Sequence, residues 1–139
     1  MGEIKAKIEL ENYFDYILFQ DKKIEKSEIR SYKMEGLVDT GAVMLMLPQD
    51  VVEKLGLRTI RTAVVSYADE RKEERDIAGG VIIKIGDRKM NTECIVGYPE
   101  SEALIGQVIM EVLDLIPDPR RRTLVTRPGS PIYPSIKMK

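Results

Sequence analysis

The first part of the chain alternates between apolar and charged residues. Between Glu3 and Leu10, isoleucine, alanine and leucine occupy every second position, with glutamate or lysine between them. A period of two places the apolar side chains on one face, so these residues predict a half-buried β-strand. Residues 12–19 hold both phenylalanines and show no clean period, which predicts an irregular connection or hairpin. We expect its aromatic side chains to close one end of the core, with a partner-binding surface as the alternative.

The middle of the chain predicts two strands and a short helix around one carboxylate. The mostly polar stretch Ile24–Val38 becomes apolar at its end and predicts a long strand that leads into Asp39. The apolar run 43–47 predicts a second strand, which Pro48 ends. A short helix should follow, because the next apolar residues fall on one side and Gly56 supplies a C-terminal stop.

Residues 58–85 have the pattern of a β-hairpin with a highly charged middle. The segment 68–76 is almost entirely charged, which predicts a solvated, mobile tip. After a tight turn, residues 90–96 alternate again and predict a strand with Cys94 as a small buried residue.

The C-terminal third predicts one more strand–helix unit, a final strand and a tail. Residues 103–106 read as a buried strand, and 107–115 as an amphipathic helix ended by prolines. Its predicted inward residues are Val108, Ile109, Val112 and Leu113. The last strand is expected at 123–126. We therefore expect a folded domain over residues 1–127 and a loosely held, Pro-rich tail over 128–139.

Composition narrows the chemistry to carboxylates. The 139 residues suit one domain, and a net charge of -1 predicts neither a nucleic-acid nor a membrane partner. The chain has no histidine, which excludes imidazole-assisted nucleophiles and the commonest zinc ligand, so no metal or cofactor is expected. A single cysteine cannot form an internal disulfide, and the N-terminal residues lack the apolar core of a signal peptide. These features predict a cytoplasmic location.

Asp39 stands where the chain leaves an apolar strand and must bend, and Gly41 is expected to supply the backbone freedom for that bend. The stretch 37–46, with Asp39-Thr40-Gly41 at its centre, resembles the active-site signature of the retroviral-type aspartic proteases, as does Ala103-Leu104-Ile105-Gly106. The order of predicted elements from about Ile4 to Thr126 is similar too. Residues 104–115 are closest to the bacterial and archaeal stand-alone members of that group.

The resemblance implies an all-β fold, a closed barrel with one or two short helices that forms half of a two-fold symmetric homodimer. It implies that Asp39 is catalytic and works with the same residue of a second copy, with Thr40, Gly41 and Ala42 completing the active-site loop. Ile105 and Gly106 should support that loop. The terminal strands, 3–10 and 123–126, are those that usually build the sheet between subunits in this family.

The family's flap, which closes over an extended peptide, falls here on Tyr67, Ala68, Asp69, Glu70 and Arg71. Relatives generally place glycine at the flap tip. The three charged residues of this tip imply a different turn and a preference for basic or polar substrates. Residues 43–45 also lack the acidic residue with which viral enzymes hold the substrate backbone.

The function that the resemblance implies is hydrolysis of peptide bonds by an aspartic endopeptidase. One alternative is a non-catalytic dimeric module that binds peptides or assembles partners on the same fold. A second is a purely structural aspartate, since Asp often accepts hydrogen bonds within turns. Aspartyl-phosphate chemistry is disfavoured, because Asp39 lacks the neighbouring acidic residue that would hold a metal ion.

Overall fold

Strands dominate the fold. The computed structural model describes residues 2–138, so Met1 and Lys139, at the outer ends of the predicted domain and tail, lie outside the described residues. The strands are β1 (Lys5–Asn12), β2 (Ser31–Val38), β3 (Leu45–Pro48), β4 (Arg58–Ser66), β5 (Lys72–Ile85), β6 (Arg88–Gly97), β7 (Ala103–Ile105), β8 (Leu115–Asp118) and β9 (Thr123–Thr126). The helices are α1 (Tyr13–Gln20), the 3-10 helix η1 (Lys26–Glu28), α2 (Gln49–Lys54) and α3 (Gln107–Leu113).

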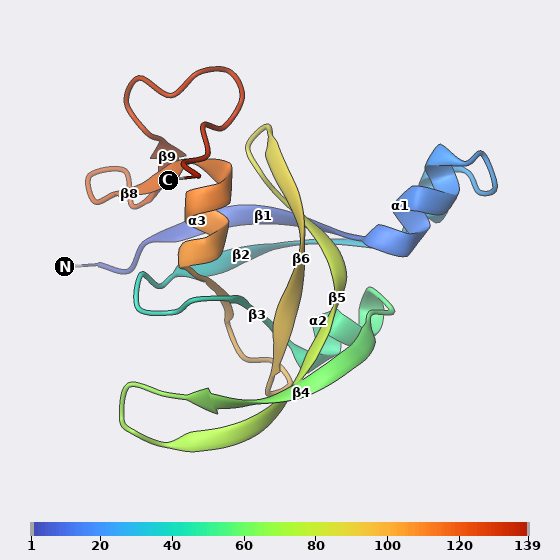
Figure 1. Cartoon of the computed structure of the whole chain (residues 1–139), viewed down its shortest axis with the longest axis horizontal. Coiled ribbons are helices and arrows are strands. Elements are labelled where there is room, and N and C mark those ends of the chain that lie inside the picture. The colour runs from blue at the N-terminus through green and yellow to red at the C-terminus, as the bar shows by residue number, and fades with distance from the viewer. Residues whose placement is uncertain (1, 139) are drawn as a thin grey trace.

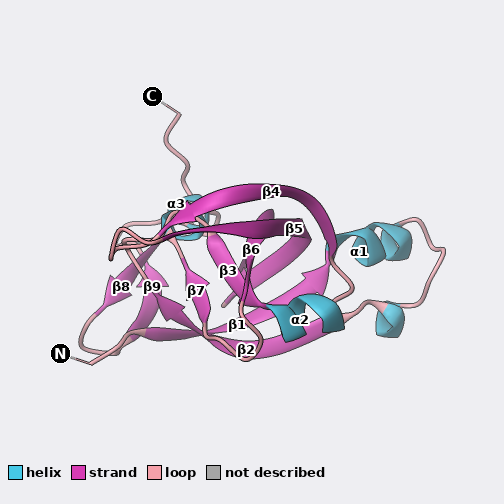
Figure 2. Ribbon diagram, turned by 90° about the horizontal axis from the view of Figure 1, so that it is seen from below, coloured by secondary structure: helices cyan, strands magenta, loops and turns pink. Residues whose placement is uncertain are grey.

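Six strands close into a barrel (Figures 1 and 2). Around the ring the order is β1, β2, β7, β3, β6 and β5, and β5 pairs back onto β1. Two pairs, β2 with β7 and β3 with β6, are parallel, and the others are antiparallel. The fourth strand, β4, pairs with β5 alone and lies outside the ring. This architecture confirms the predicted all-β barrel.

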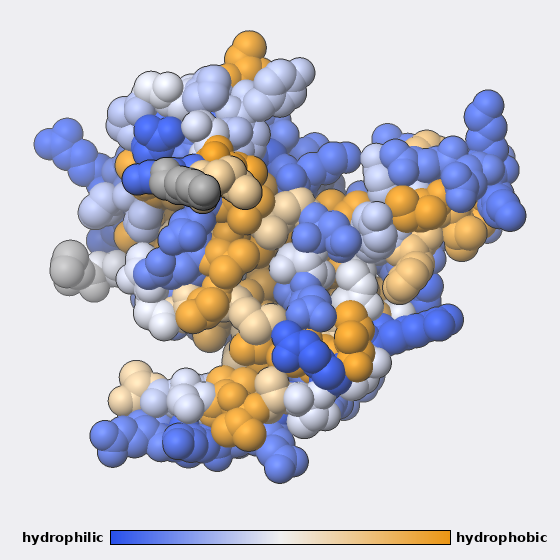
Figure 3. All heavy atoms as spheres, in the orientation of Figure 1, coloured by the Kyte–Doolittle hydropathy of each residue, from blue (hydrophilic) through white to orange (hydrophobic). Residues whose placement is uncertain are grey.

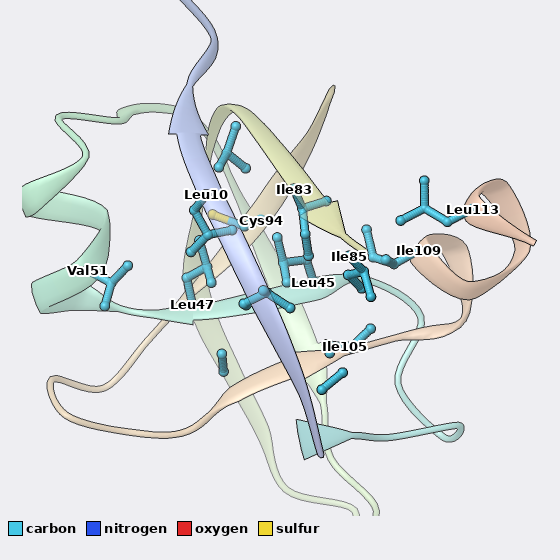
Figure 4. Packing of buried hydrophobic residues seen from close by; sticks show 14 of the residues in the cluster. Leu10, Leu45, Leu47, Val51, Ile83, Ile85, Cys94, Ile105, Ile109 and Leu113 are labelled. Carbon is cyan, nitrogen blue, oxygen red and sulfur yellow. The ribbon is translucent and has the colours of Figure 1, made fainter. Parts of the chain in front are cut away.

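The barrel interior is filled by the alternating apolar side chains that the sequence predicted. Ala6, Ile8 and Leu10 of β1 are at most 2% exposed. Figure 4 shows Leu10 beside Cys94 in the core cluster, and Ile109 of α3 beside Ile85 at its other side. Cys94 is fully buried, as predicted, and burial raises the pKa of its thiol to about 12.

The prediction for residues 12–19 was wrong. They form α1, which begins where the Asn12 side chain accepts a hydrogen bond of 3.0 Å from the Asp15 backbone amide. Within this helix only Asp15 is buried, and its carboxylate pairs with the Arg30 guanidinium at 2.9 Å. Phe14 remains 56% exposed. Figure 1 shows α1 projecting from the end of β1, and the core cluster of the described residues includes no residue of α1, so its aromatic side chains do not close the core.

Three other boundaries differ from the prediction. The expected long strand 24–38 is shorter, because Glu25 and Glu28 form a capping box around η1 and β2 starts only at Ser31. The charged segment 68–76 is only partly a loop, since β5 already begins at Lys72. The last helix ends at Leu113, where the next residue adopts a left-handed φ of 57°.

Two details of the C-terminal third also needed correction. Val108 of α3 is 37% exposed instead of inward, and Met110 is buried in its place. The residues after α3 form β8, which pairs with β9 in a separate two-stranded sheet.

The second half of β1 has strand neighbours on both sides within the chain. Glu9–Asn12 pair with β5, and all of them except Asn12 also pair with β2. Before Glu9, β1 pairs with β2 alone, and β9 pairs with β8 alone, so these parts of the two strands predicted to build the sheet between subunits have strand pairing on one side.

The tail is attached to the domain through two buried charged side chains. The carboxylate of Asp114 accepts hydrogen bonds from the Arg127 guanidinium, the Ser130 hydroxyl and the Ser135 backbone amide, the shortest at 2.7 Å. Arg88 donates to the carbonyl oxygen of Pro131 at 2.6 Å and to the Ser130 hydroxyl at 3.0 Å. These bonds hold residues 130–135, contrary to the prediction of a loosely held tail. Within residues 2–138, no helix has the length and apolarity needed to cross a membrane.

Candidate active site

Asp39 follows the last residue of β2 and is held through its backbone. Val38 lies opposite Ile105 in the parallel pair of β2 and β7, and the Asp39 amide donates to the Ile105 carbonyl oxygen at 3.0 Å. The loop then turns back, so that the Ala42 amide donates to the Asp39 carbonyl at 3.1 Å. The Asp39 carboxylate accepts from the Gly41 amide at 2.9 Å and remains half-buried. The side chain is therefore oriented while staying accessible from outside the barrel.

The start of α3 supports the far side of this loop. The amides of Gln107 and Val108 donate to the carbonyl oxygens of Ala42 and Val43, at 2.8 and 3.0 Å. The loop approaches so closely that a Cβ on Gly106 would lie 2.6 Å from the Met44 carbonyl oxygen. Glycine is therefore the only residue that this position accommodates without moving backbone. The structure brings Ile105 and Gly106 against the Asp39 loop, as the sequence predicted.

Gln107 is a site residue that the sequence reading missed. Its side-chain amide donates a hydrogen bond of 2.7 Å to the carbonyl oxygen of Thr40, next to Asp39. A glutamine at the exposed start of a helix carries no special signal. Its position directly after the strand-ending Gly106 is the clue that could have marked it.

Gly41 plays a different role from the predicted one. The prediction gave it a backbone conformation that a side chain would forbid, yet its φ lies outside the left-handed region of +20° to +160°. A Cβ there would meet only the Asp39 carboxylate, at 3.3 Å. The backbone of this loop therefore does not demand glycine. A side chain at Gly41 would instead fill the space beside the Asp39 carboxylate.

Residues 61–76 of β4, β5 and their connecting turn form a hairpin arm, which we call the flap hairpin after the predicted flap, and this arm extends on the same side of the molecule as the Asp39 loop (Figure 1). Figure 3 shows a hollow between this arm, at the bottom of the view, and the body of the protein. The tip is a tight turn in which the Tyr67 amide donates to the Arg71 carbonyl at 2.8 Å. The side chain of Asp69 caps it by accepting from the Arg71 amide at 3.1 Å.

Glu70 at the tip adopts a conformation that ordinarily favours glycine. Its φ is +66°, in the left-handed region, and its amide donates to the Tyr67 carbonyl at 3.0 Å. A left-handed conformation at a residue with a Cβ costs roughly 1–2 kcal/mol. Asp69 closes the turn, and Ala68 is exposed beside it.

The described residues 2–138 contain no group of three or more His, Cys, Asp or Glu side chains placed to hold a metal ion. The chemistry of the site is that of a single accessible carboxylate on a loop that two strand ends and a helix hold in place. A closed six-stranded barrel with such a loop and a hairpin arm is the half-fold of an acid protease.

Comparison with known families agrees with this geometry. The sequence model of the family described as aspartyl protease matches residues 26–109, more than half of the chain. The match includes the Asp39 loop, the flap hairpin and Gly106. The chain therefore belongs to the retropepsin-like aspartyl protease family. No curated protein matches it.

Proposed function

We propose that this protein is an aspartic endopeptidase that works as a homodimer, with Asp39 paired with Asp39 of the partner subunit. The observation that carries the proposal is the single carboxylate at the rim of the barrel, fixed through its backbone by Ile105 and supported by α3. Peptide hydrolysis of this type needs two carboxylates, and the loop offers one. A two-fold axis beside Asp39 supplies the second and makes the interface self-complementary.

The pair would act as one acid and one base. Two carboxylates within hydrogen-bonding distance cannot both ionise, so they share a single proton. The ionised carboxylate takes a proton from a water molecule, whose oxygen attacks the peptide carbonyl carbon. The protonated carboxyl group donates to the carbonyl oxygen as the tetrahedral intermediate forms. The apparent pKa values then belong to the pair, so activity should follow a bell-shaped pH profile on the acidic side of neutral.

The loop residues next to Asp39 suit this arrangement. Thr40 is exposed, so its side chain is available for contact with its counterpart in the proposed dimer. Gly41 leaves the carboxylate free on one side, which lets a substrate backbone approach, and Ala42 keeps the following position small. We propose that an extended peptide lies between this loop and the flap hairpin, where it pairs with the backbone of the arm. The exposed charges of Asp69, Glu70 and Arg71 favour polar or basic peptides.

A second candidate is a non-catalytic dimeric module that binds peptides or assembles partners. The charged flap tip favours it, because a tip with side chains leaves less room for substrate than one with glycine. For either function we propose a reducing compartment such as the cytoplasm, which suits a single cysteine that is fully buried.

One experiment separates the two candidates. The mass of the protein in solution is measured together with cleavage of a peptide library, with and without a transition-state inhibitor of aspartic proteases. Asp39→Asn should abolish cleavage and keep the dimer, while Asp87→Asn, in an exposed turn, should change neither. Cleavage by Asp39→Asn at the wild-type rate would rule out the proposed mechanism.

A further inference from the structure

The outer part of the flap hairpin has charged side chains on the face that turns toward the protein. Along β5, Lys72, Glu74 and Asp76 are exposed, whereas the side chains of Glu73 and Arg75 are only 22% and 15% exposed. With a period of two, the latter pair shares one face of the strand. Partly buried charges are costly unless they are paired, so this face must make specific contacts.

Those contacts are made with Tyr98, in the loop after β6. The Tyr98 hydroxyl donates to the Glu73 carboxylate, and the Arg75 guanidinium lies over the Tyr98 ring at 3.6 Å from its centroid. Arg75 also pairs with Glu73 at 3.3 Å. The three side chains thus form a closed set of contacts, two from the flap hairpin and one from the body. We call this set the flap anchor.

The body side of the flap anchor is itself fixed. The Ser101 amide donates to the Tyr98 carbonyl at 3.1 Å, which folds the loop into a turn. The neighbouring Glu100 amide donates to the Asp50 carboxylate in α2 at 2.7 Å. The loop is therefore fixed at two points, where it leaves β6 and where it is bonded to α2. A contact from the flap to Tyr98 is a contact to the rigid part of the molecule.

The other end of the flap anchor reaches the tip. The Arg71 guanidinium lies 3.6 Å from the Glu73 carboxylate and 4.5 Å from the centroid of the Tyr67 ring. The Tyr98 hydrogen bond, with further help from Tyr67, Arg75 and Arg71, holds the pKa of Glu73 below its usual value. The same carboxylate raises the pKa of Tyr98. The contact is thus a neutral phenol bonded to an ionised carboxylate, which is a strong type of hydrogen bond.

The sheet itself does little to position the outer arm. The pairing of β5 with β6 starts at Ile77, so from Lys72 to Asp76 the only strand neighbour of β5 is β4. A two-stranded hairpin without further support is marginally stable in water. The flap anchor lies within this unsupported part.

From these contacts we propose that Tyr98 and Glu73 are positioning residues, which hold the flap hairpin against the body of the protein at the loop after β6, with Arg75 holding the Tyr98 ring in place. For its effect on catalysis the inference rests on the proposed function. A substrate must lift the arm to enter, and an anchored arm closes again over the bound peptide. Loss of the anchor leaves the chemical groups intact and weakens retention of the peptide.

Hydrogen exchange of the full-length protein tests the anchor without relying on activity. Tyr98→Phe keeps the ring beneath Arg75 and removes the hydroxyl, and Glu73→Gln removes the charge of the acceptor. Each should speed exchange of the backbone amides in residues 67–76 by about 5- to 20-fold, the range that loss of a hydrogen bond to a charged group produces at a partly exposed site. In the Tyr98→Phe, Glu73→Gln double variant, the effects should overlap instead of multiplying.

A matched control is available at the base of the same arm. Arg61 of β4 pairs with Glu93 at 3.0 Å, also on the surface, so Glu93→Gln removes a comparable ion pair outside the anchor. It should leave exchange at residues 67–76 within about 2-fold of wild type, as exposed pairs contribute little. Unchanged exchange in both Tyr98→Phe and Glu73→Gln, or an equal increase in Glu93→Gln, would overturn the inference.

Peptide cleavage then connects the anchor to the reaction. KM should rise by about 5-fold or more in Tyr98→Phe, while kcat should change by less than about 2-fold, because the interaction acts on retention and not on the reacting groups. A fall in kcat with unchanged KM would contradict this role. If the wild-type protein cleaves nothing, the proposed function fails, and the exchange measurement still decides whether the anchor exists.

Discussion

The side-chain amide of Gln107 lies 2.7 Å from the carbonyl oxygen of Thr40, so the first residue of α3 is bonded directly to the loop that carries Asp39. Two backbone hydrogen bonds from α3 reach the same loop, at Ala42 and Val43. The helix therefore restrains the loop at three positions after Asp39, which are Thr40, Ala42 and Val43. Gln107 supplies the one of these restraints that a side-chain substitution can remove.

Gln107→Ala should lower the free energy of unfolding by about 0.5–1.5 kcal/mol, the usual net value of one hydrogen bond. Under the proposed function, activity should fall more steeply than stability, because the loop that loses the restraint carries Asp39, the proposed catalytic residue. Denaturant unfolding and kcat measure the two effects. Gln49→Ala, which removes an exposed hydrogen bond to Glu53 in α2, is the control and should leave kcat unchanged.

Gly106→Ala and Gly41→Ala should separate structure from function. The added methyl group at Gly106 would collide with backbone atoms of the Asp39 loop, and we expect a loss of about 1–3 kcal/mol of stability or more. At Gly41 the methyl group meets only the Asp39 carboxylate, so unfolding should change by less than about 1 kcal/mol. Cleavage should nevertheless fall in both variants. Retained cleavage in Gly41→Ala would show that substrate does not use this space.

Glu70→Gly should stabilise the flap tip. The left-handed φ is energetically unfavourable for glutamate, whereas glycine adopts it without strain. Glycine, however, loses more conformational entropy on folding. The balance predicts a gain of about 0.5 kcal/mol or more, visible as slower hydrogen exchange in residues 67–71. Glu74→Gly, in the adjacent exposed strand position, should have the opposite effect.

Asp114→Asn should remove a pH-dependent part of the stability. Hydrogen bonds from Arg127 and then Ser130 hold the pKa of Asp114 far below its usual value. A carboxylate with a lowered pKa stabilises the folded protein above its unfolded pKa, near pH 4, and this contribution disappears as the pH falls through the lower folded pKa. Wild type should therefore exceed Asp114→Asn in stability at pH 7, and the two should converge toward pH 2. Unfolding curves across that range measure the difference, and Asp87→Asn should show no such convergence.

The sequence predicted the parts of the fold that depend on local pattern. The alternation from Glu3 to Leu10 predicted β1, and the strand end at Gly106 was correctly predicted to lie against the Asp39 loop. The helix α1 was missed since its apolar residues have no helical face to bury. The Asn12 cap, with an acidic residue three positions later, was the available signal.

The local pattern of apolar and polar residues could not predict contacts between distant segments. Nothing near Arg88 indicates that its guanidinium reaches Pro131, 43 residues later, or that Asp114 collects the tail. The role of Glu73 could not be predicted for a different reason. Its neighbours in β5 are all charged, so the residue types do not indicate which positions are buried and which are exposed. Its partner, Tyr98, is 25 residues away.

The position of β4 outside the closed ring has a consequence for how such a protein can diversify. The barrel closes through β1 and β5, so residues of β4 and of the outer half of β5 can be exchanged without disturbing the packing of the interior. Selection for a new peptide preference and selection for folding then act on different segments of the chain. If the proposed function holds, a flap hairpin transplanted from a relative, together with the residue at position 98 that meets it, is the unit that should carry peptide preference from one member of the family to another.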